Sequence, residues 1–250
     1  MTKLMLITGG SRGIGAATAR LAAARGYDVA ISYAVNQEAA DAVVAGIHAL
    51  GRKALAIEAD MGKPEDIARL FKAVDAGFGR LDAFFNNAGI VGKAARFVDI
   101  PLAQLQRVLA VNTAGAFIAA QEATRRMSTR LGGKGGVIVN MSSIAAKMGG
   151  ANEATDYGLS KGGIDSLTIG LAKELAGEGI RVNAVRPGLI HTEIHASMGV
   201  PDRIERFKTL VPMQRGGTPE EVAEAVLWLC SDQASYCTGV LLEVTGGRGI

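Results

Sequence analysis

The chain has 250 residues, 48% of them hydrophobic and 20% charged, which suits one large α/β domain and excludes a disordered chain. Its 27 basic and 24 acidic side chains leave a net charge of +3, and no basic stripe with interleaved aromatic residues is present, so we expect no nucleic-acid partner. The apolar start before Thr8 is too short for a membrane span or a signal peptide, and the two cysteines, Cys230 and Cys237, are typical of a reduced protein. We therefore expect a cytoplasmic protein with no membrane partner.

Apolar runs typical of buried strands alternate with helix-period stretches along the whole chain. Strands are expected at residues 4–8, 29–33, 54–58, 83–85, 137–141, 181–186 and 240–244. Helices are expected at about 13–25, 37–49, 64–77, 102–130, 155–177 and 219–230. This alternation predicts an α/β fold with a doubly wound, seven-stranded parallel sheet, helices on both faces, and a single domain over residues 1–250.

One interval, residues 189–217, breaks this rhythm because no strand follows promptly. A long insertion after a strand is usually a lid or a binding loop, so we expect a substrate loop there. It carries His191 and His195 at a spacing that metal sites also use. No third ligand is evident, so we expect no metal and favour a lid or pocket role for the two histidines over plain exposure to solvent.

The first strand runs into a glycine-rich turn, Thr8-Gly9-Gly10-Ser11-Arg12-Gly13-Ile14-Gly15, and a helix follows. Glycines allow a tight turn and a close approach of a pyrophosphate to the backbone, while the helix start offers free amides and a positive dipole. Turns collect glycine for structural reasons too, but the strand before and the helix after favour dinucleotide binding.

Tyr157 and Lys161 stand four residues apart, which places both on one face of a helix. The ordinary pKa of a phenol is about 10, and a nearby ammonium favours the phenolate and lowers that pKa. Such a pair could serve general acid/base catalysis, although an isolated pair of this kind is usually surface decoration.

Together these motifs make the chain resemble the short-chain dehydrogenase/reductase family, in its single-domain bacterial type similar to 3-oxoacyl-acyl-carrier-protein reductases and glucose dehydrogenases. The matching motifs, in the family's order, are Thr8-Gly9-x-x-x-Gly13-x-Gly15, Asp60, Asn86-Asn87-Ala88-Gly89, Asn112, Ser142-Ser143, Tyr157-x-x-x-Lys161 and Pro187-Gly188. The resemblance covers essentially the whole chain. It implies a Rossmann fold and an NAD(P)-dependent oxidoreductase that transfers a hydride between nicotinamide and a carbonyl or secondary-alcohol substrate.

By resemblance, the catalytic residues are Asn112, Ser143, Tyr157 and Lys161. Tyr157 would exchange the proton, Lys161 would also hold the nicotinamide ribose, and Asn112 would hold a water that links Lys161 to solvent. Ser143 would hydrogen-bond the substrate oxygen. Its neighbour Ser142 competes for this role, because the interval before Tyr157 is slightly longer than is common in the family.

The resemblance also implies the cofactor-binding residues. They are Gly9, Ser11, Arg12, Gly13, Ile14, Gly15, Tyr33, Asn36, Asp60, Met61, Asn87, Ala88, Gly89, Tyr157, Lys161, Pro187, Gly188, Ile190 and Thr192. Asp60 would bind the adenine amino group, or else only begin a helix before Pro64. Ile190 and Thr192 would contact the nicotinamide carboxamide.

The second strand indicates which dinucleotide is preferred. Asp28 lies at the usual distance for an acid that binds the ribose, but it opens the strand, whereas the ribose lies beyond the strand's end. The residues at that end, Ser32, Tyr33 and Asn36, carry no carboxylate, and Arg12 could pair with a 2′-phosphate unless it is merely solvated. We therefore expect NADP(H) to be preferred, with NAD(H) possible.

Two further expectations rest on the resemblance. Relatives are commonly tetramers, so we expect a homotetramer, or else a homodimer, that uses the helix at 155–177 and the tail Leu241–Ile250. The alternative to an enzyme is a catalytically silent NAD(P)-binding sensor or scaffold on the same fold, which has no need of the four catalytic residue types.

Overall fold

The structure is a computed structural model that describes residues 2–249, so Met1 and Ile250, the outermost residues of the expected domain and tail, lie outside the described residues. The strands are β1 (Leu4–Ile7), β2 (Asp28–Tyr33), β3 (Ala54–Glu58), β4 (Ala83–Asn86), β5 (Gly136–Met141), β6 (Ile180–Pro187) and β7 (Leu241–Val244). They pair in parallel in the order β3-β2-β1-β4-β5-β6-β7, which confirms the predicted doubly wound, seven-stranded sheet.

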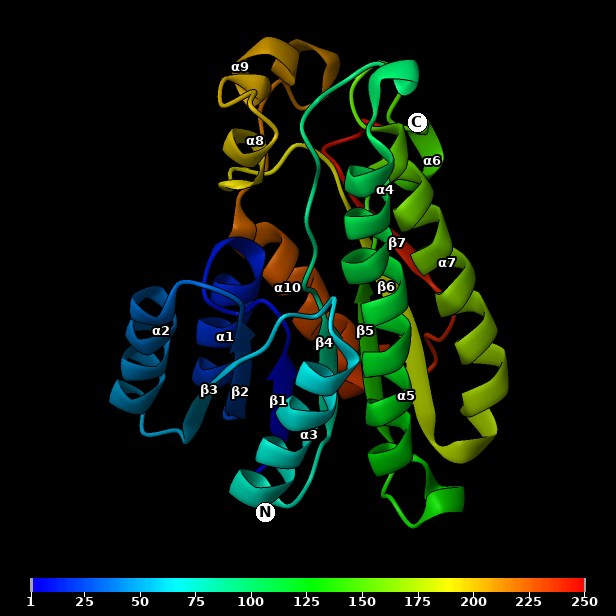
Figure 1. Cartoon of the computed structure of the whole chain (residues 1–250). Helices are drawn as coiled ribbons and strands as arrows, with labels where there is room; N and C mark the ends of the chain where they lie inside the picture. Colours follow the sequence, from blue (N-terminus) through cyan, green and yellow to red (C-terminus); the bar gives the residue numbers. More distant parts are fainter. Residues whose placement is uncertain (1, 250) are drawn as a thin grey trace.

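Helices cover both faces of this sheet (Figure 1). One face packs against α1 (Gly13–Ala24), α2 (Gln37–Ala49) and α10 (Pro219–Cys230). The other packs against α3 (Pro64–Phe78), α5 (Ala116–Met127) and α7 (Thr155–Leu175), with α4 (Leu102–Leu109) beside α7. Successive strand residues alternate between the two cores, as Met5 and Leu6 do, which is why the strands are apolar without interruption.

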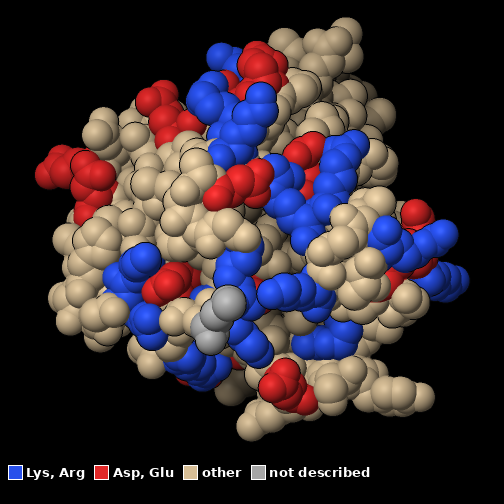
Figure 2. All heavy atoms as spheres, turned by 90° about the horizontal axis from the view of Figure 1, so that it is seen from below, with Lys and Arg blue, Asp and Glu red and all other residues tan. Residues whose placement is uncertain are grey.

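The strand order reverses between β1 and β4, and this fixes where a ligand can enter. The chain leaves β1 toward β2 and β3 on one side and leaves β4 toward β5, β6 and β7 on the other. A crevice forms at the carboxyl ends of the two central strands in folds of this kind. At the opposite end of the sheet, basic and acidic side chains stand side by side (Figure 2). Ion pairs of the chain include Arg25–Glu224, just after α1, and Arg80–Asp82, just before β4.

The continuous helix expected at 102–130 is wrong. Helix α4 ends at Leu109, a wide π turn spans Ala110–Gly115, α5 ends at Met127, and a 3₁₀ turn follows at Thr129–Leu131. At Gly115 a Cβ would lie only 1.8 Å from the carbonyl oxygen of Met61, so the helix can pass the β3–α3 loop only at a glycine. Such π turns often occur at functional sites, and Asn112 lies within this one.

The expected substrate loop at 189–217 forms a small helical cap. It contains α8 (Ile194–Ser197), α9 (Arg203–Phe207) and a 3₁₀ turn at Lys208–Leu210, and its ends are joined by a bridge between Ile190 and Gly217. The cap has its own apolar contacts, with Leu189, Ile204 and Val211 buried together. It stands above the carboxyl ends of the strands (Figure 1).

The remaining elements are short. Helix α6 (Ala145–Met148) precedes α7, and 3₁₀ turns occur at Phe97–Asp99, Ala176–Glu178 and Asp232–Ala234. The expected bounds of β3, α2 and α10 are confirmed, and apart from the helix expected at 102–130 the other ends differ by at most two residues, as at Thr8, which lies in the turn after β1.

Candidate active site

A cavity of about 470 Å³ opens at the carboxyl ends of the strands. Its walls come from the glycine-rich turn, the ends of β2 to β6, the start of α7 and the first residues of the cap. Every residue expected at the site lines this cavity except Asn112. Segments that are far apart in sequence are therefore brought to one place, as the family resemblance implies.

The glycine-rich turn is held to β4 through Thr8. The Thr8 hydroxyl accepts hydrogen bonds from the backbone N–H groups of Asn87 (2.9 Å) and Ala88 (3.0 Å). The Asn87 amide donates to the carbonyls of Thr8 (2.7 Å) and Gly9 (3.1 Å). At Gly15 a Cβ would stand 2.2 Å from the Gly9 carbonyl oxygen, so the turn closes this tightly only because that position is a glycine.

The end of β2 presents neutral groups, and the glycine-rich turn adds one free cation to the same cavity. Ser32, Tyr33 and Asn36 line the cavity there, and the Asn36 side chain caps α2 by accepting from Ala39 N–H at 2.9 Å. Arg12, in the glycine-rich turn, lines the same cavity, is exposed, and has no ion-pair or hydrogen-bonded partner for its guanidinium among residues 2–249. No carboxylate is contributed by residues 32–36.

Asp60 is already engaged by a residue that the sequence analysis missed. Its carboxylate accepts from Arg107 at 2.9 and 3.0 Å and from Gly62 N–H at 2.9 Å. Partial burial disfavours the charged form of Asp60, but these hydrogen bonds outweigh it, so its pKa lies below the ordinary value. Arg107 also lines the cavity, and nothing in the sequence signals that this residue of α4 pairs with the acid after β3.

Lys161 is 2% exposed on the sheet side of α7. Its ammonium donates to the Met141 carbonyl at 2.7 Å and lies 5.5 Å from the centre of the Tyr157 ring. Burial lowers the pKa of Lys161 to about 8, against a smaller raising effect from the charge of Asp165. The predicted proximity of Tyr157 and Lys161 is thus present.

The expected lowering of the Tyr157 pKa is wrong for the protein as it stands. Burial raises the pKa of the phenol, and this outweighs the lowering by a hydrogen bond with Ser143 and by the charge of Arg203. The phenol therefore stays protonated at neutral pH. Sequence spacing gives the neighbour but not the degree of desolvation, which the packing of the pocket decides.

The two adjacent serines point to different places. The Ser142 hydroxyl donates to the buried Asp165 carboxylate at 2.6 Å, and Arg186 donates to the other oxygen of that carboxylate at 2.7 Å. The Ser143 hydroxyl accepts from Ala145 N–H at 3.1 Å and lies close enough to the Tyr157 phenol to lower its pKa. Ser143 is therefore the serine beside the phenol, whereas Ser142 fastens β5 to α7.

Asn112 lies behind the cavity wall and is 1% exposed. Its side chain accepts from Ile90 N–H and donates to the Ile90 carbonyl, both at 2.8 Å, and donates to Ser160 Oγ at 3.1 Å. A Cβ at Gly89 would lie 3.4 Å from both the Asn112 oxygen and the Lys161 nitrogen. Asn112 thus stands beside Lys161 and ties the β4 loop to α7.

The two histidines of the cap do not converge. His191 is exposed, whereas His195 is buried and hydrogen-bonded through Nε2 with the Ile190 carbonyl at 2.9 Å. Within residues 2–249 no group of three or more His, Cys, Asp or Glu side chains could hold a metal ion.

Comparison with known proteins identifies the family. Residues 9–248 match the family model described as enoyl-(acyl carrier protein) reductase. The uncharacterized oxidoreductase YgfF of Escherichia coli (strain K12) is 47% identical over 98% of this chain and 99% of its own length. A short chain dehydrogenase from Burkholderia cenocepacia J2315, solved in complex with NADP, superposes with a TM-score of 0.90 at 36% identity, covering 99% of this chain and 98% of that chain. The chain belongs to the short-chain dehydrogenase/reductase family.

As a member of the short-chain dehydrogenase/reductase family, the protein is an NAD(P)-dependent oxidoreductase. A second relative is the L-rhamnose 1-dehydrogenase (NAD(P)(+)) of Sphingomonas sp. (strain SKA58), 39% identical over 98% of this chain and 95% of its own length. Over residues 2–249, the helices are all too short or too polar to cross a membrane.

Replacement of Lys161 by methionine measures how much the burial of its ammonium group destabilises the folded protein. The free energy of unfolding of the variant should exceed that of the wild type at pH 7 by about 1–3 kcal/mol, because folding no longer removes a charged ammonium group from water. Between about pH 8 and 10.5 the unfolded lysine holds a proton that the folded one releases, so wild-type stability rises with pH and the difference shrinks.

Urea unfolding at pH 7 and pH 10 measures this effect. Lys173→Met, on the exposed side of the same helix, serves as the control and should show no such pH-dependent difference. A Lys161→Met variant that is less stable than the wild type at both pH values would contradict the desolvation account.

Proposed function

We propose that the protein transfers a hydride between NADP(H) and a carbonyl or secondary-alcohol substrate, with Tyr157 as the general acid and base. The observation that carries this proposal is the meeting of Tyr157, Ser143 and Lys161 in the cavity that the glycine-rich turn also lines. Adenosine, pyrophosphate and nicotinamide can therefore lie in one crevice that ends at an acid/base group.

The residues present fit a dinucleotide. The turn leaves the backbone bare at Gly9, Gly13 and Gly15, and the amides at the start of α1 face a cavity large enough for an extended ligand. Asp60 and Met61 would contact the adenine, and Asn87, Ala88 and Gly89 would line the adenosine side. Pro187, Gly188, Ile190 and Thr192 would enclose the nicotinamide.

Charge at the end of β2 supports a preference for NADP(H). Arg12 is free to pair with a 2′-phosphate, and Ser32 and Asn36 add neutral donors without a carboxylate to repel it. Asp60 lies after β3 and is neutralised by Arg107. The NADP in the Burkholderia structure supports this preference, and the name of the Sphingomonas enzyme, which covers both dinucleotides, leaves NAD(H) usable.

The nicotinamide, when bound, supplies the hydride for reduction and accepts it in oxidation. Tyr157 donates its phenolic proton to the substrate oxygen as charge develops there, and its raised pKa keeps that proton available at neutral pH. Ser143 holds the same oxygen by a hydrogen bond. The Lys161 ammonium stabilises the phenolate that remains, and Asn112 fixes the position of the lysine's helix.

Assembly and location follow as further parts of the proposal. We propose a homotetramer or homodimer that uses α7 and the tail after Leu241, because Leu159 and Ile169 on α7 are 60% and 40% exposed. Free Cys230 and Cys237 support a reducing cytoplasm. All seven strands form one sheet, and both layers of helices pack on it, which supports a single domain.

Arg12→Ala should change the cofactor preference. Loss of the charged partner of the 2′-phosphate should lower kcat/KM for NADPH about tenfold or more and leave kcat/KM for NADH nearly unchanged. Initial rates with both cofactors at fixed ketone measure the two values. A wild-type enzyme that clearly prefers NADH would contradict the assignment, as would an equal loss with both cofactors.

Tyr157→Phe should leave NADPH affinity near the wild-type value and lower kcat by about 10²–10⁴-fold, because it removes the transferable proton and little of the packing. NADPH oxidation with ketones, oxoacyl thioesters and sugars measures turnover, and fluorescence titration measures affinity. Tyr236→Phe is the matched control, since Tyr236 is fully exposed. Retained activity of Tyr157→Phe, or NADPH binding without turnover of any carbonyl by the wild type, would refute the assigned chemistry.

A further inference from the structure

Arg107 extends from α4 to the part of the cavity wall that carries Asp60, and both side chains line the cavity. Its Nη2 donates to Asp60 Oδ1 at 2.9 Å and to Asp60 Oδ2 at 3.0 Å. A Cβ at Gly62 would lie 2.4 Å from Arg107 Nη1, so the guanidinium is seated directly against the Gly62 backbone. Arg107 is therefore held at the cavity wall by the loop after β3.

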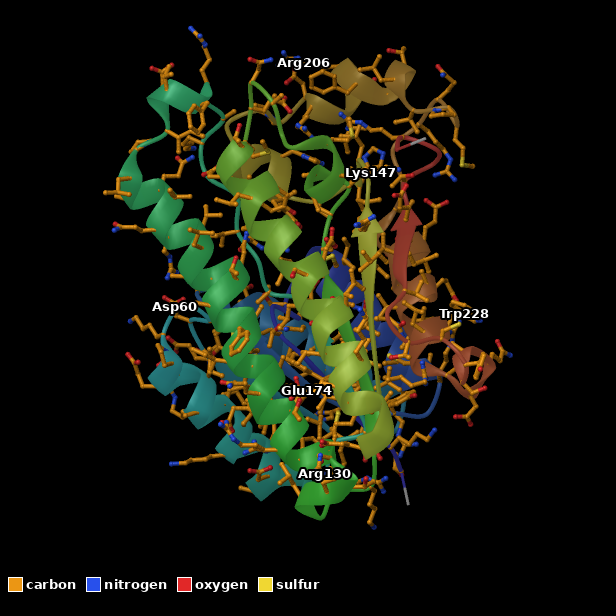
Figure 3. The ribbon with its side chains drawn as sticks, turned by 90° about the vertical axis from the view of Figure 1, so that its right-hand side faces the viewer. Asp60, Arg130, Lys147, Glu174, Arg206 and Trp228 are labelled. Atoms are coloured by element: carbon orange, nitrogen blue, oxygen red, sulfur yellow. The ribbon has the colours of Figure 1, made fainter. Side chains whose placement is uncertain are left out.

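The backbone of Asp60 is held as well. Its N–H donates to the Asp66 carboxylate at 2.9 Å, and its carbonyl accepts from Lys63 N–H at 2.9 Å. Figure 3 shows Asp60 above α3 and beside the helical stretch of α4 and α5. Because backbone and side chain are both held, the protein sets the direction of the carboxylate before any ligand arrives.

The hydrogen bonds at Asp60 leave one of its oxygens able to accept again. An ionised carboxylate has about four acceptor positions and no hydrogen to donate. Oδ1 accepts from both Arg107 and Gly62 N–H, whereas Oδ2 accepts from Arg107 alone within the part of the chain that the structure describes. The side chain is 24% exposed, so a ligand in the cavity can reach the carboxylate.

We propose that Arg107 is a positioning residue for the base of the cofactor. It holds the Asp60 carboxylate so that Oδ2 accepts a hydrogen bond from the amino group of adenine and repels the oxygen that hypoxanthine carries at the same ring position. The amino group donates, whereas that oxygen only accepts, as the carboxylate does. This inference rests on the proposed function, because it assigns a further residue to the binding of the same dinucleotide.

The pairing of Arg107 favours this role over a contact with the 2′-phosphate. Its charge is matched by Asp60, and its Nη2 is committed to both carboxylate oxygens. A phosphate bound by Arg107 would also face the Asp60 carboxylate, whereas Arg12 lines the same cavity without an ion-pair partner among residues 2–249. The two arginines therefore have separable effects, Arg12 on the phosphate and Arg107 on the base.

The test compares the binding of three reduced cofactors, NADPH, NADH and the hypoxanthine analogue of NADPH. Fluorescence titration gives their dissociation constants without turnover. The wild type should bind NADPH about tenfold or more tightly than the analogue, because a hydrogen bond to a charged group is replaced by a repulsion. Arg107→Met should lower this base preference about fivefold or more, because the carboxylate is then free to turn away, and should leave the preference for NADPH over NADH unchanged.

Three further variants sharpen the comparison. Asp60→Asn supplies an amide that donates to the hypoxanthine oxygen, so the base preference should nearly vanish. Arg12→Ala should show the opposite pattern to Arg107→Met, with the NADPH-over-NADH preference lowered and the base preference kept. Arg69→Met is the matched control, since Arg69 pairs with Asp66 beside the same loop, is 57% exposed and does not line the cavity. It should leave both preferences at the wild-type values.

Three results would overturn the role of Arg107. The first is equal binding of NADPH and the hypoxanthine analogue by the wild type. The second is an Arg107→Met variant that weakens all three cofactors alike and keeps the base preference, which would assign the arginine to general packing or stacking. The third is a loss of the NADPH-over-NADH preference in Arg107→Met with the base preference kept, which would assign it to the 2′-phosphate.

Titration without a carbonyl substrate separates this inference from the proposed function. If the wild type shows the expected base preference, Arg107→Met lowers it and no carbonyl is reduced, the proposed chemistry fails and the role of Arg107 stands. If carbonyls are reduced and Arg107→Met keeps the base preference, the role of Arg107 fails and the oxidoreductase stands. A wild type that binds none of the three cofactors would overturn both.

Discussion

Burial of one ammonium group is the constraint on which the rest of the site depends. Lys161 is almost fully enclosed, and its charge is supported by the Met141 carbonyl and by Asp165, one helical turn further along α7. Removal of a charge from water is expensive, so such a position persists only where the fold holds it firmly in place. The same enclosure gives Lys161 and Tyr157 displaced pKa values in opposite directions, which is the pattern expected of a proton-transferring pair.

Polar contacts between the strand ends and the neighbouring helices hold Lys161 and α7 in place. Asp165 joins Ser142, just after β5, to Arg186 on β6, and Arg186 also contacts Glu243 on β7 at 3.5 Å. Glu243 in turn meets Lys147 of α6, which Figure 3 shows on the flank formed by α6 and β7. The strand ends, α7 and α6 are thus connected by charged and polar contacts. A single rigid edge therefore positions both Tyr157 and Ser143.

Much of the fold and site could be predicted from the sequence because it depends on local pattern. The glycine-rich turn, the alternating elements and the helical spacing of Tyr157 and Lys161 are each written within a short stretch of chain. What the sequence did not predict depends on distant partners. The break at Gly115 is imposed by the Met61 carbonyl, and Asp60 pairs with Arg107 from α4.

Packing also separates two pairs of residues that the sequence leaves alike. Ser142 and Ser143 are alike in sequence, but a buried acid on α7 engages the first and leaves the second beside the phenol. His191 and His195 share a helical spacing, yet one faces solvent and the other is buried against the Ile190 carbonyl. In both cases the deciding hydrogen-bond partner is distant from the local motif: the Asp165 carboxylate for Ser142 and the Ile190 backbone carbonyl for His195. The spacing of residues along the sequence does not predict such partners.

The most direct measurement of the central claim is a crystal structure of the protein with NADP⁺ bound. The account predicts the pyrophosphate on the glycine-rich turn, the Lys161 ammonium within hydrogen-bonding distance of the nicotinamide ribose, and the Tyr157 hydroxyl facing the reactive carbon of the nicotinamide ring. A nicotinamide ring bound outside this cavity, or a Tyr157 hydroxyl turned away from it in that complex, would contradict the account.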